Sequence, residues 1–214
     1  MAPRAVIFDF NGTLSRDEPI LYEIFSELFA EHAKPLSAQE YFDHLAGLSD
    51  PEIVRTWLGR DHPHVEAVIA ARIRLYRERV ADGSSVPEET RAAVRYAAER
   101  VPVAIVSCAA RAEIEPVLAA AGLAALVTTI VPAEEARAGK PAPDGYLVAL
   151  ERLGGDIRAE EVVVLEDTEA GIASAKGAGM RCIAVLGTLA PARLAEADEI
   201  VQQIDVELMR RLLA

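Results

Sequence analysis

The chain has few of the side chains that most often carry nucleophilic or acid–base chemistry. Its 214 residues include two cysteines, three lysines and four histidines, and every histidine precedes residue 65. Two thiols, Cys108 and Cys182, are too few for a disulfide framework and fit a reducing cytoplasm. Chemistry in the later part of the chain must therefore proceed without imidazole.

Positive charge is also scarce. Lysine and arginine number 22 against 34 aspartates and glutamates, so the formal net charge is -12. Such a surface repels phosphate backbones and anionic lipids, and we expect neither nucleic-acid nor membrane binding. No apolar run approaches the length of a membrane span, and the opening segment MAPRAVIFDF leads into a strand-like run rather than a secretory signal. An anionic ligand would need a metal ion or a local group of cations.

Apolar residues are abundant and occur in short runs. They form 51% of the sequence against 26% charged residues, which is enough for one domain with a large core. Short apolar runs that alternate with helical patterns predict an α/β fold with a doubly wound parallel sheet. The strands are predicted at residues 5–10, 103–107, 126–131, 162–165 and 182–186, and the helices between them at 89–100, 112–121, 145–153 and 171–178.

Residues 15–85 interrupt this alternation, because they contain no convincing strand. Helices are predicted at 19–32, from Ser37 with a capping box to Glu40, at 51–58 and at 65–80, whose arginines are expected to form a solvated face. An insert of this size between the first two strands predicts a helical cap domain. We expect a core of residues 1–14 and 87–214, a cap of residues 15–86 and a return hinge at 81–89.

The segment after the first strand, DFNGTL, places a carboxylate where a buried run ends. Ligands of open parallel sheets bind beyond the carboxyl ends of the strands, so this position is a candidate for chemistry. The pair Asn11-Gly12 is a strong turn signal. A turn explains that pair, but it does not explain Asp9 at the end of a buried strand.

The segments after the second and third strands supply a hydroxyl and an ammonium group. Ser107 either caps the next helix or, with the backbone amides of Cys108 and Ala109, donates to a bound anion. Cys108 has no histidine to activate it, so we do not expect a nucleophile there. Lys140, in AGKPAPDGY, is followed by prolines that restrict its backbone, and the segment lacks the pattern of a P-loop.

Two adjacent acids, Glu166 and Asp167, follow the fourth strand in VVVLEDTEAG. They could form an acidic helix start, which the helix dipole favours. They could instead hold a divalent cation, because two crowded carboxylates repel one another without one. Mg²⁺ suits such a site, since it takes few protein carboxylates together with phosphate oxygens.

In order and spacing, these four pieces resemble the motifs of the haloacid dehalogenase superfamily, whose members are mostly phosphatases. The matching elements are DFNGTL, Ser107, Lys140 in GKPAPDGY, and LEDTEAG. The helical insert resembles the cap that the family places between its first two motifs. The resemblance implies a Rossmann-like core, Mg²⁺ as cofactor and a small phosphorylated metabolite as substrate. We expect a cytoplasmic protein that is a monomer or a weak homodimer.

The resemblance implies a role for each matching residue. Asp9 would attack phosphorus and carry an aspartyl-phosphate, while Lys140 and Mg²⁺ would neutralise charge and Ser107 would bind the transferring oxygens. The implied metal ligands are Asp9, Asn11 through its carbonyl, Asp167, and Glu166 as a ligand or just outside the coordination sphere. The implied catalytic residues are Asp9, Asn11, Ser107 and Lys140, and the implied substrate-binding residues are Gly12, Thr13, Gly47, Ser107, Cys108, Ala109 and Lys140.

Asn11 departs from the family pattern, which has a second aspartate two residues after the nucleophile. That aspartate protonates the leaving oxygen and later activates water, and a carboxamide can do neither near neutral pH. Losing such acid–base catalysis costs about 10²–10⁴ in rate. Four interpretations remain open: a slow phosphatase or one restricted to good leaving groups, an engineered variant that traps a complex, a phospho-ligand-binding protein with little turnover, or another branch of the family's chemistry.

The other branches fit the sequence poorly. Phosphonate-cleaving relatives use a cap lysine, but Lys34 is predicted to lie in a loop between helices. Dehalogenase relatives have an aromatic residue in place of Asn11. Mutase relatives have a histidine where Leu21 aligns, and basic residues in the cap loop, where this chain has His44 and Asp50. We therefore expect a hydrolase whose leaving group is small or weakly anionic.

Overall fold

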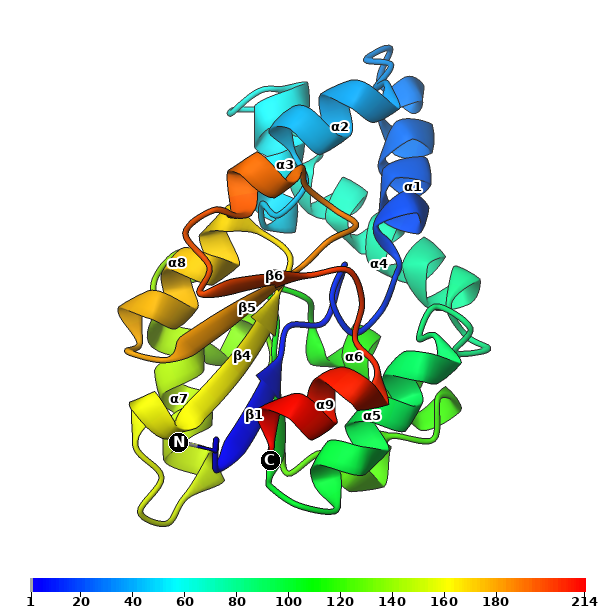
Figure 1. Ribbon diagram of the computed structural model, residues 1–214. Coiled ribbons are helices and arrows are strands. Elements are labelled where there is room, and N and C mark those ends of the chain that lie inside the picture. Colours follow the sequence, from blue (N-terminus) through cyan, green and yellow to red (C-terminus); the bar gives the residue numbers. More distant parts are fainter. Residues whose placement is uncertain (1) are drawn as a thin grey trace.

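A parallel sheet organises the molecule. The computed structural model describes residues 2–214, so residue 1 of the predicted core lies outside the described part. Within that part the sheet has six parallel strands in the order β3-β2-β1-β4-β5-β6 (Figure 1). Their bounds are β1 Ala5–Phe8, β2 Val103–Val106, β3 Thr129–Val131, β4 Val162–Glu166, β5 Arg181–Val185 and β6 Glu199–Val201. The strand order reverses at β1, which lies between β2 and β4.

Helices cover both faces of this sheet, and alternate strand residues point to opposite faces. Val6 and Phe8 belong to one hydrophobic cluster, and Ile7 and Val164 belong to the other. The first cluster includes residues of α5 (Glu88–Ala98), α6 (Arg111–Ala120) and α9 (Val206–Leu212), and the second includes residues of α7 (Asp144–Leu153) and α8 (Glu169–Gly177). Burial on both faces explains why the strands are almost wholly apolar.

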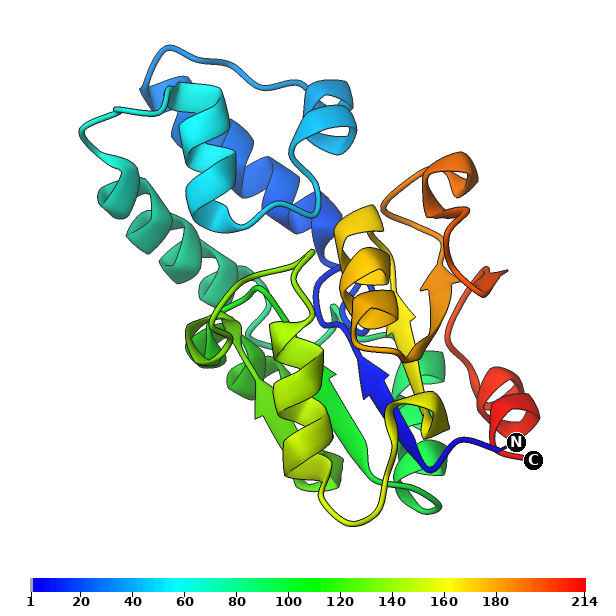
Figure 2. The ribbon, with the colours of Figure 1, turned by 90° about the vertical axis from the view of Figure 1, so that its left-hand side faces the viewer.

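The insert between β1 and β2 is helical. It contains α1 Glu18–Glu31, α2 Ala38–His44, α3 Asp50–Leu58 and α4 Val65–Arg79. These helices gather beyond the carboxyl ends of the strands (Figures 1 and 2). Helix α2 begins with the expected capping box, in which Ser37 and Glu40 bond reciprocally. The apolar face of α1, including Leu21 and Phe25, belongs to the same cluster as Phe8 of β1, so the insert packs directly onto the core.

The predicted α/β class and the parallel, doubly wound sheet are confirmed, while some boundaries differ. Strand β1 ends at Phe8, before the predicted end at residue 10, and residues 124–126 form a 3-10 turn before β3. The sequence analysis missed α9 and β6. Strand β6 is a short edge strand whose Ile200 is 38% exposed, so it has no buried apolar run to mark it. No helix in residues 2–214 is long and apolar enough to cross a bilayer.

A buried ion pair joins the helical insert to the core. The guanidinium of Arg72 in α4 pairs with the carboxylate of Glu113 in α6 and lies 3.4 Å from an oxygen of Asp50. The expectation of a solvated arginine face is therefore wrong for Arg72, which is 4% exposed and lies over the rings of Phe25 and Tyr76. Burial alone would lower the pKa of Arg72, but the two carboxylates raise it. Burial raises the pKa of Glu113 more than Arg72 lowers it, so the charge of Glu113 depends on this pairing.

We predict that Glu113→Ala lowers the free energy of unfolding by about 3–5 kcal/mol. The substitution removes one partner of a buried ion pair and leaves the guanidinium of Arg72 buried without that partner. The measurement is urea unfolding followed by circular dichroism. Glu78→Ala is the matched control, because Glu78 forms an exposed 3.3 Å pair with Arg74 and such pairs contribute little. Equal, small effects of the two substitutions would contradict the buried linkage.

Candidate active site

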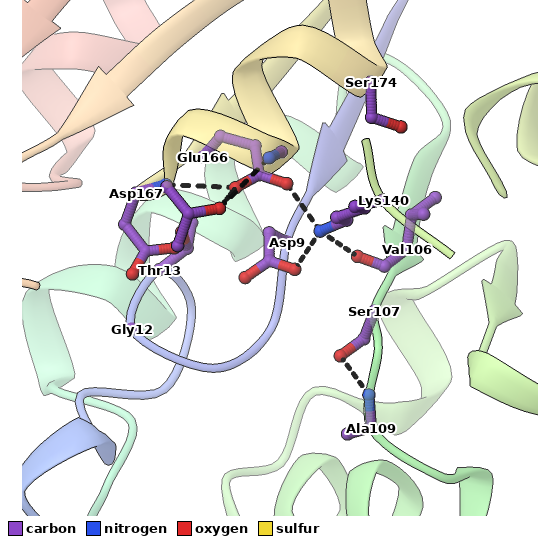
Figure 3. Close-up of polar contacts among 12 residues, drawn as sticks. Asp9, Gly12, Thr13, Val106, Ser107, Ala109, Lys140, Glu166, Asp167 and Ser174 are labelled. Carbon is purple, nitrogen blue, oxygen red and sulfur yellow. Dashed lines mark hydrogen bonds and ion pairs between the residues drawn. The ribbon is translucent and has the colours of Figure 1, made fainter. Parts of the chain in front are cut away.

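Four of the predicted site residues meet at the carboxyl edge of the sheet. Asp9 follows β1, Glu166 ends β4 and Asp167 follows it, so the side-by-side pairing of β1 and β4 brings these acids together. Oxygen atoms of the three carboxylates lie within 4.8 Å of one another, and all three residues are buried. Lys140 reaches the same point from the loop between β3 and α7 (Figure 3).

The ammonium group of Lys140 links Asp9, which follows β1, to Glu166, which ends β4. It donates to Asp9 Oδ1, to Glu166 Oε1 and, at 3.4 Å, to the carbonyl oxygen of Val106 at the end of β2. The loop that carries Lys140 is fixed in turn, because the hydroxyl of Ser174 in α8 donates to the carbonyl of Ala142 at 2.6 Å. The side chain of Lys140 is thus held by its acceptors, and its loop is held by Ser174. A lysine in a solvent-exposed loop would have neither constraint.

Hydroxyl groups hold Asp167 in place. Thr13 Oγ1 donates to Asp167 Oδ1 at 2.9 Å, and the hydroxyl of Thr188, after β5, donates to Asp167 Oδ2. Gly12 makes this possible: it has a φ of +74°, and a Cβ at that position would lie 1.9 Å from Asp167 Oδ2. Thr13 and Gly12 therefore support the acidic cluster. Thr188 was not predicted as a site residue, because nothing in its local sequence indicates that its hydroxyl reaches Asp167.

Glu166 is fixed by a tyrosine of α7 and by the backbone that follows β4. Tyr146 of α7 donates its hydroxyl to Glu166 Oε1 at 2.6 Å, and the backbone amide of Asp167 lies 3.2 Å from Glu166 Oε2. Gly171, in the first turns of α8, faces the carboxylate so closely that a Cβ there would lie 1.9 Å from Glu166 Cδ. The glycine in LEDTEAG thus leaves room for the glutamate side chain.

Lys140 compensates only part of the negative charge that the three carboxyl groups carry when all of them are ionised. Burial raises the pKa of Asp9 to about 7, opposed by Lys140 and assisted by Glu166. Burial, together with Asp9 and Glu166, raises the pKa of Asp167 well above its usual range. Burial lowers the pKa of Lys140, but the adjacent carboxylates more than offset this, so the net shift is upward. Three buried carboxylates facing one ammonium group fit the oxygen-rich donor set that a hard divalent cation takes.

The turn after β2 forms the next wall of the site. Ser107, Cys108 and Ala109 all line a cavity of about 60 Å³ that Asp9 and Lys140 also line. Ser107 Oγ accepts a hydrogen bond from the amide of Ala109 at 3.0 Å, so its hydroxyl hydrogen is free to point elsewhere. Burial raises the pKa of the Cys108 thiol, which does not favour a thiolate nucleophile and agrees with the expectation from sequence.

Asn11 lines the same cavity, but its amide group points to a carboxylate that was not predicted. Asn11 Nδ2 donates to Asp17 Oδ2 at 2.9 Å and lies 3.4 Å from the Tyr76 hydroxyl. Asp17 also accepts from the amide of Gly12 at 3.1 Å and from Tyr76, and it has no exposed surface. Burial raises the pKa of Asp17, while these donors oppose the rise. An asparagine at position 11 is therefore matched to its surroundings.

The helical insert supplies the opposite wall of the cavity. Gly47 and Asp50, from the predicted cap loop, line it, and Gly47 lies so close to the loop after β4 that a Cβ would be 2.9 Å from Thr168 Cγ2. Sequence reasoning missed Glu18 and Tyr41, which also line the cavity. Glu18 adjoins the start of α1 and resembles an ordinary acidic helix start, so only tertiary packing reveals it.

Comparison with known proteins agrees with the geometry. Residues 6–185 match the family model described as haloacid dehalogenase-like hydrolase. The chain is therefore a member of the haloacid dehalogenase-like hydrolase family, and the relatives named as phosphatases support a hydrolase of this kind.

Two curated relatives extend over most of the chain. Validoxylamine A 7'-phosphate phosphatase of Streptomyces hygroscopicus subsp. limoneus is 27% identical over 94% of each chain. The phosphorylated carbohydrates phosphatase of Thermotoga maritima is 26% identical over 84% of this chain and 83% of its own length. Among solved structures, a CbbY mutant from Rhodobacter sphaeroides in complex with xylulose-(1,5)bisphosphate has a TM-score of 0.84 at 25% identity, covering 96% of both chains.

We predict that Asn11→Asp lowers the free energy of unfolding at pH 7 by about 1–3 kcal/mol, because it sets a second carboxylate against Asp17. One carboxyl of such a pair has a folded-state pKa above its unfolded value. The folded state then binds the extra proton, and the penalty shrinks as the pH falls toward 5. Denaturant unfolding at pH 5 and pH 7 measures both effects. The double variant Asn11→Asp/Asp17→Asn should recover the loss, and a single variant as stable as the parent at pH 7 would argue against the Asn11–Asp17 contact.

Proposed function

We propose that this protein is a Mg²⁺-dependent phosphatase that hydrolyses a small phosphorylated metabolite through an aspartyl-phosphate on Asp9. One observation carries the proposal: Asp9, Lys140 and the acids Glu166 and Asp167 meet around one buried point. The turn at Ser107 lies beside that point and lines the same cavity. Family membership and relatives named as phosphatases support the same class of reaction.

The donor set supports magnesium. Asp9, Asp167 and the carbonyl oxygen of Asn11 would hold the ion, and Glu166 would act as a further ligand or keep Lys140 in place. When bound, Mg²⁺ would neutralise charge on the phosphate and on the attacking carboxylate. Because Lys140 already bonds to both Asp9 and Glu166, its ammonium group would favour the ionised form of Asp9 against the effect of burial.

The chain's own groups would position the phosphate. Asp9 would attack phosphorus and form the aspartyl-phosphate. The Ser107 hydroxyl and the amide of Cys108 would donate to the transferring oxygens, since both residues line the cavity with Asp9, and the amide of Ala109 would hold Ser107 Oγ in place or turn to the phosphate when it binds. Phosphoryl transfer depends mainly on such positioning and charge stabilisation.

The helical insert would select the leaving group. We assign residues 15–86 as the cap domain and residues 1–14 and 87–214 as the core, with the site between them. Arg72 is the cation that the insert brings to the cavity wall, and Asp50 and Glu113 already neutralise it. A second phosphate on the substrate would therefore find little free positive charge there. A monophosphate with a neutral leaving group fits better than a bisphosphate.

A phospho-ligand-binding protein with little turnover is the second candidate, because Asn11 cannot exchange a proton with the leaving group. The tight fit of Asn11 against Asp17 supports an asparagine that belongs to this fold rather than one introduced to trap a complex. The same fit leaves open which group would replace the missing acid.

We predict that the wild-type protein releases inorganic phosphate from at least one member of a panel of sugar and polyol monophosphates when Mg²⁺ is present. Chelation with EDTA should abolish the release, because the carboxylate cluster would then repel the substrate. Asp9→Asn should be inactive and should also fail to retain ³²P after acid quenching, whereas the wild type is labelled. Thermal unfolding of Asp9→Asn serves as the control for folding.

The outcomes separate the two candidates. Activity that survives in Asp9→Asn would overturn the aspartyl-phosphate mechanism. If neither the wild type nor Asn11→Asp turns over any ester, while calorimetry detects binding of the same esters, the protein is a binding protein.

A further inference from the structure

The cavity wall opposite the strand edge carries a carboxyl group that the proposed mechanism does not use. Glu18, at the start of α1, lines the cavity together with Asp9 and Asn11. It is 7% exposed, and it lines this cavity as well as a second one that Gly12 and Thr188 also line. The leaving group of a phosphate bound at Asp9 would extend toward the helical insert, which is the side where Glu18 lies.

The surroundings of Glu18 favour its protonated form at neutral pH. Burial raises the pKa of Glu18 to about 8, assisted by Asp17 beside it in the chain and by Asp9 from the end of β1. Tyr41 of α2 donates its hydroxyl to Glu18 Oε2 at 2.9 Å and opposes the rise, as does Arg72 of α4. The tyrosine bond fixes Oε2, whereas Oε1 accepts no hydrogen bond from any residue in 2–214 and is available to the cavity.

We propose that Glu18 is the general acid of this phosphatase and takes the place of the aspartate that Asn11 replaces. The proposal rests on the proposed function, since a general acid has a role only if an ester is cleaved. Glu18 is chosen because it lines the cavity of the nucleophile, is buried, and has one carboxylate oxygen anchored by Tyr41.

Two other acids near Asn11 and the cavity, Asp17 and the partly buried Asp50, already pair with other groups. Asp17 has no exposed surface and accepts hydrogen bonds from Asn11, Gly12 and Tyr76. Asp50 lines the cavity, and burial raises its pKa against the opposing effect of Arg72, but its carboxylate lies 3.4 Å from that guanidinium and is occupied in neutralising it. Neither is placed to give a proton to a leaving oxygen as Glu18 is.

The chemistry balances in two steps. In the first, a carboxylate oxygen of Asp9 forms a bond to phosphorus, the bond from phosphorus to the ester oxygen breaks, and the proton of Glu18 moves to that oxygen and yields the free alcohol. In the second, the Glu18 carboxylate takes a proton from water while the water oxygen attacks phosphorus. The aspartyl–phosphorus bond breaks, and hydrogen phosphate, the Asp9 carboxylate and protonated Glu18 result.

Two aryl esters of similar size test the proposal, because phenol is a much weaker acid than 4-nitrophenol and needs the proton far more. We expect Glu18→Gln to lower kcat/KM for phenyl phosphate about 10²-fold and to change it less than about threefold for 4-nitrophenyl phosphate. Because the second step loses its base with either ester, kcat should fall for both. A pre-steady-state burst of 4-nitrophenolate should therefore accompany Glu18→Gln.

Matched variants and a pH profile keep the outcomes distinct. Asp50→Asn removes another, partly buried carboxylate of the same cavity and should show no such dependence on the leaving group. Asn11→Asp in the Glu18→Gln background should restore much of the kcat/KM for phenyl phosphate. In the wild type, kcat/KM for phenyl phosphate should decline above about pH 8, and this limb should be absent with 4-nitrophenyl phosphate.

Failure of this proposal differs from failure of the proposed function. If Asp9→Asn is inactive but Glu18→Gln lowers kcat/KM equally for both esters, or for neither, the phosphatase stands and Glu18 is not its acid. If Asp9→Asn retains activity, the proposed function itself falls. Should Glu18→Gln not fold, the two wild-type pH profiles decide: matching profiles for the two esters overturn the role of Glu18.

Discussion

Mutual repulsion among buried carboxylates is the constraint on which the site depends. Asp9, Glu166 and Asp167 are brought within bonding distance of one cation because β1 and β4 are neighbours in a parallel sheet and both strands end at the same edge. Lys140 offsets part of this charge, and tyrosine and threonine hydroxyls orient the rest. A fold that buries three acids so close together holds unfavourable energy that a divalent cation would relieve.

The helical insert forms two pairs of polar or charged groups with the core near this site. Arg72 is paired across the boundary with Glu113, so the position of the insert over the site is fixed by a contact that costs free energy to break. Asn11 and Asp17 form a second matched pair at the start of the insert. Replacing one member of either pair changes the environment of the other member. One member of each pair, Asp17 and Arg72, also influences Glu18 in the cavity wall. The insert thus contributes ionisable groups to the wall of the cavity.

The sequence was informative wherever a local pattern carried the signal. Short apolar runs predicted the parallel strands, and an acid at the end of such a run, as at Asp9 and Asp167, indicated the site. It was uninformative where position depends on packing between distant segments. Arg72 belongs to an arginine-rich helix and looked solvated, and Glu18 looked like an ordinary helix-start acid. Only the packing of α1 and α4 against the core buries these two ionisable groups.

The most direct test of the account is where a divalent cation binds. Crystals grown with Mn²⁺ as a stand-in for Mg²⁺ would give an anomalous difference peak that locates the ion. The account predicts one strong peak between the carboxylates of Asp9 and Asp167, lost in Asp167→Asn crystals grown in the same way. A map with no peak there, or with its peak elsewhere on the acidic surface, would contradict it.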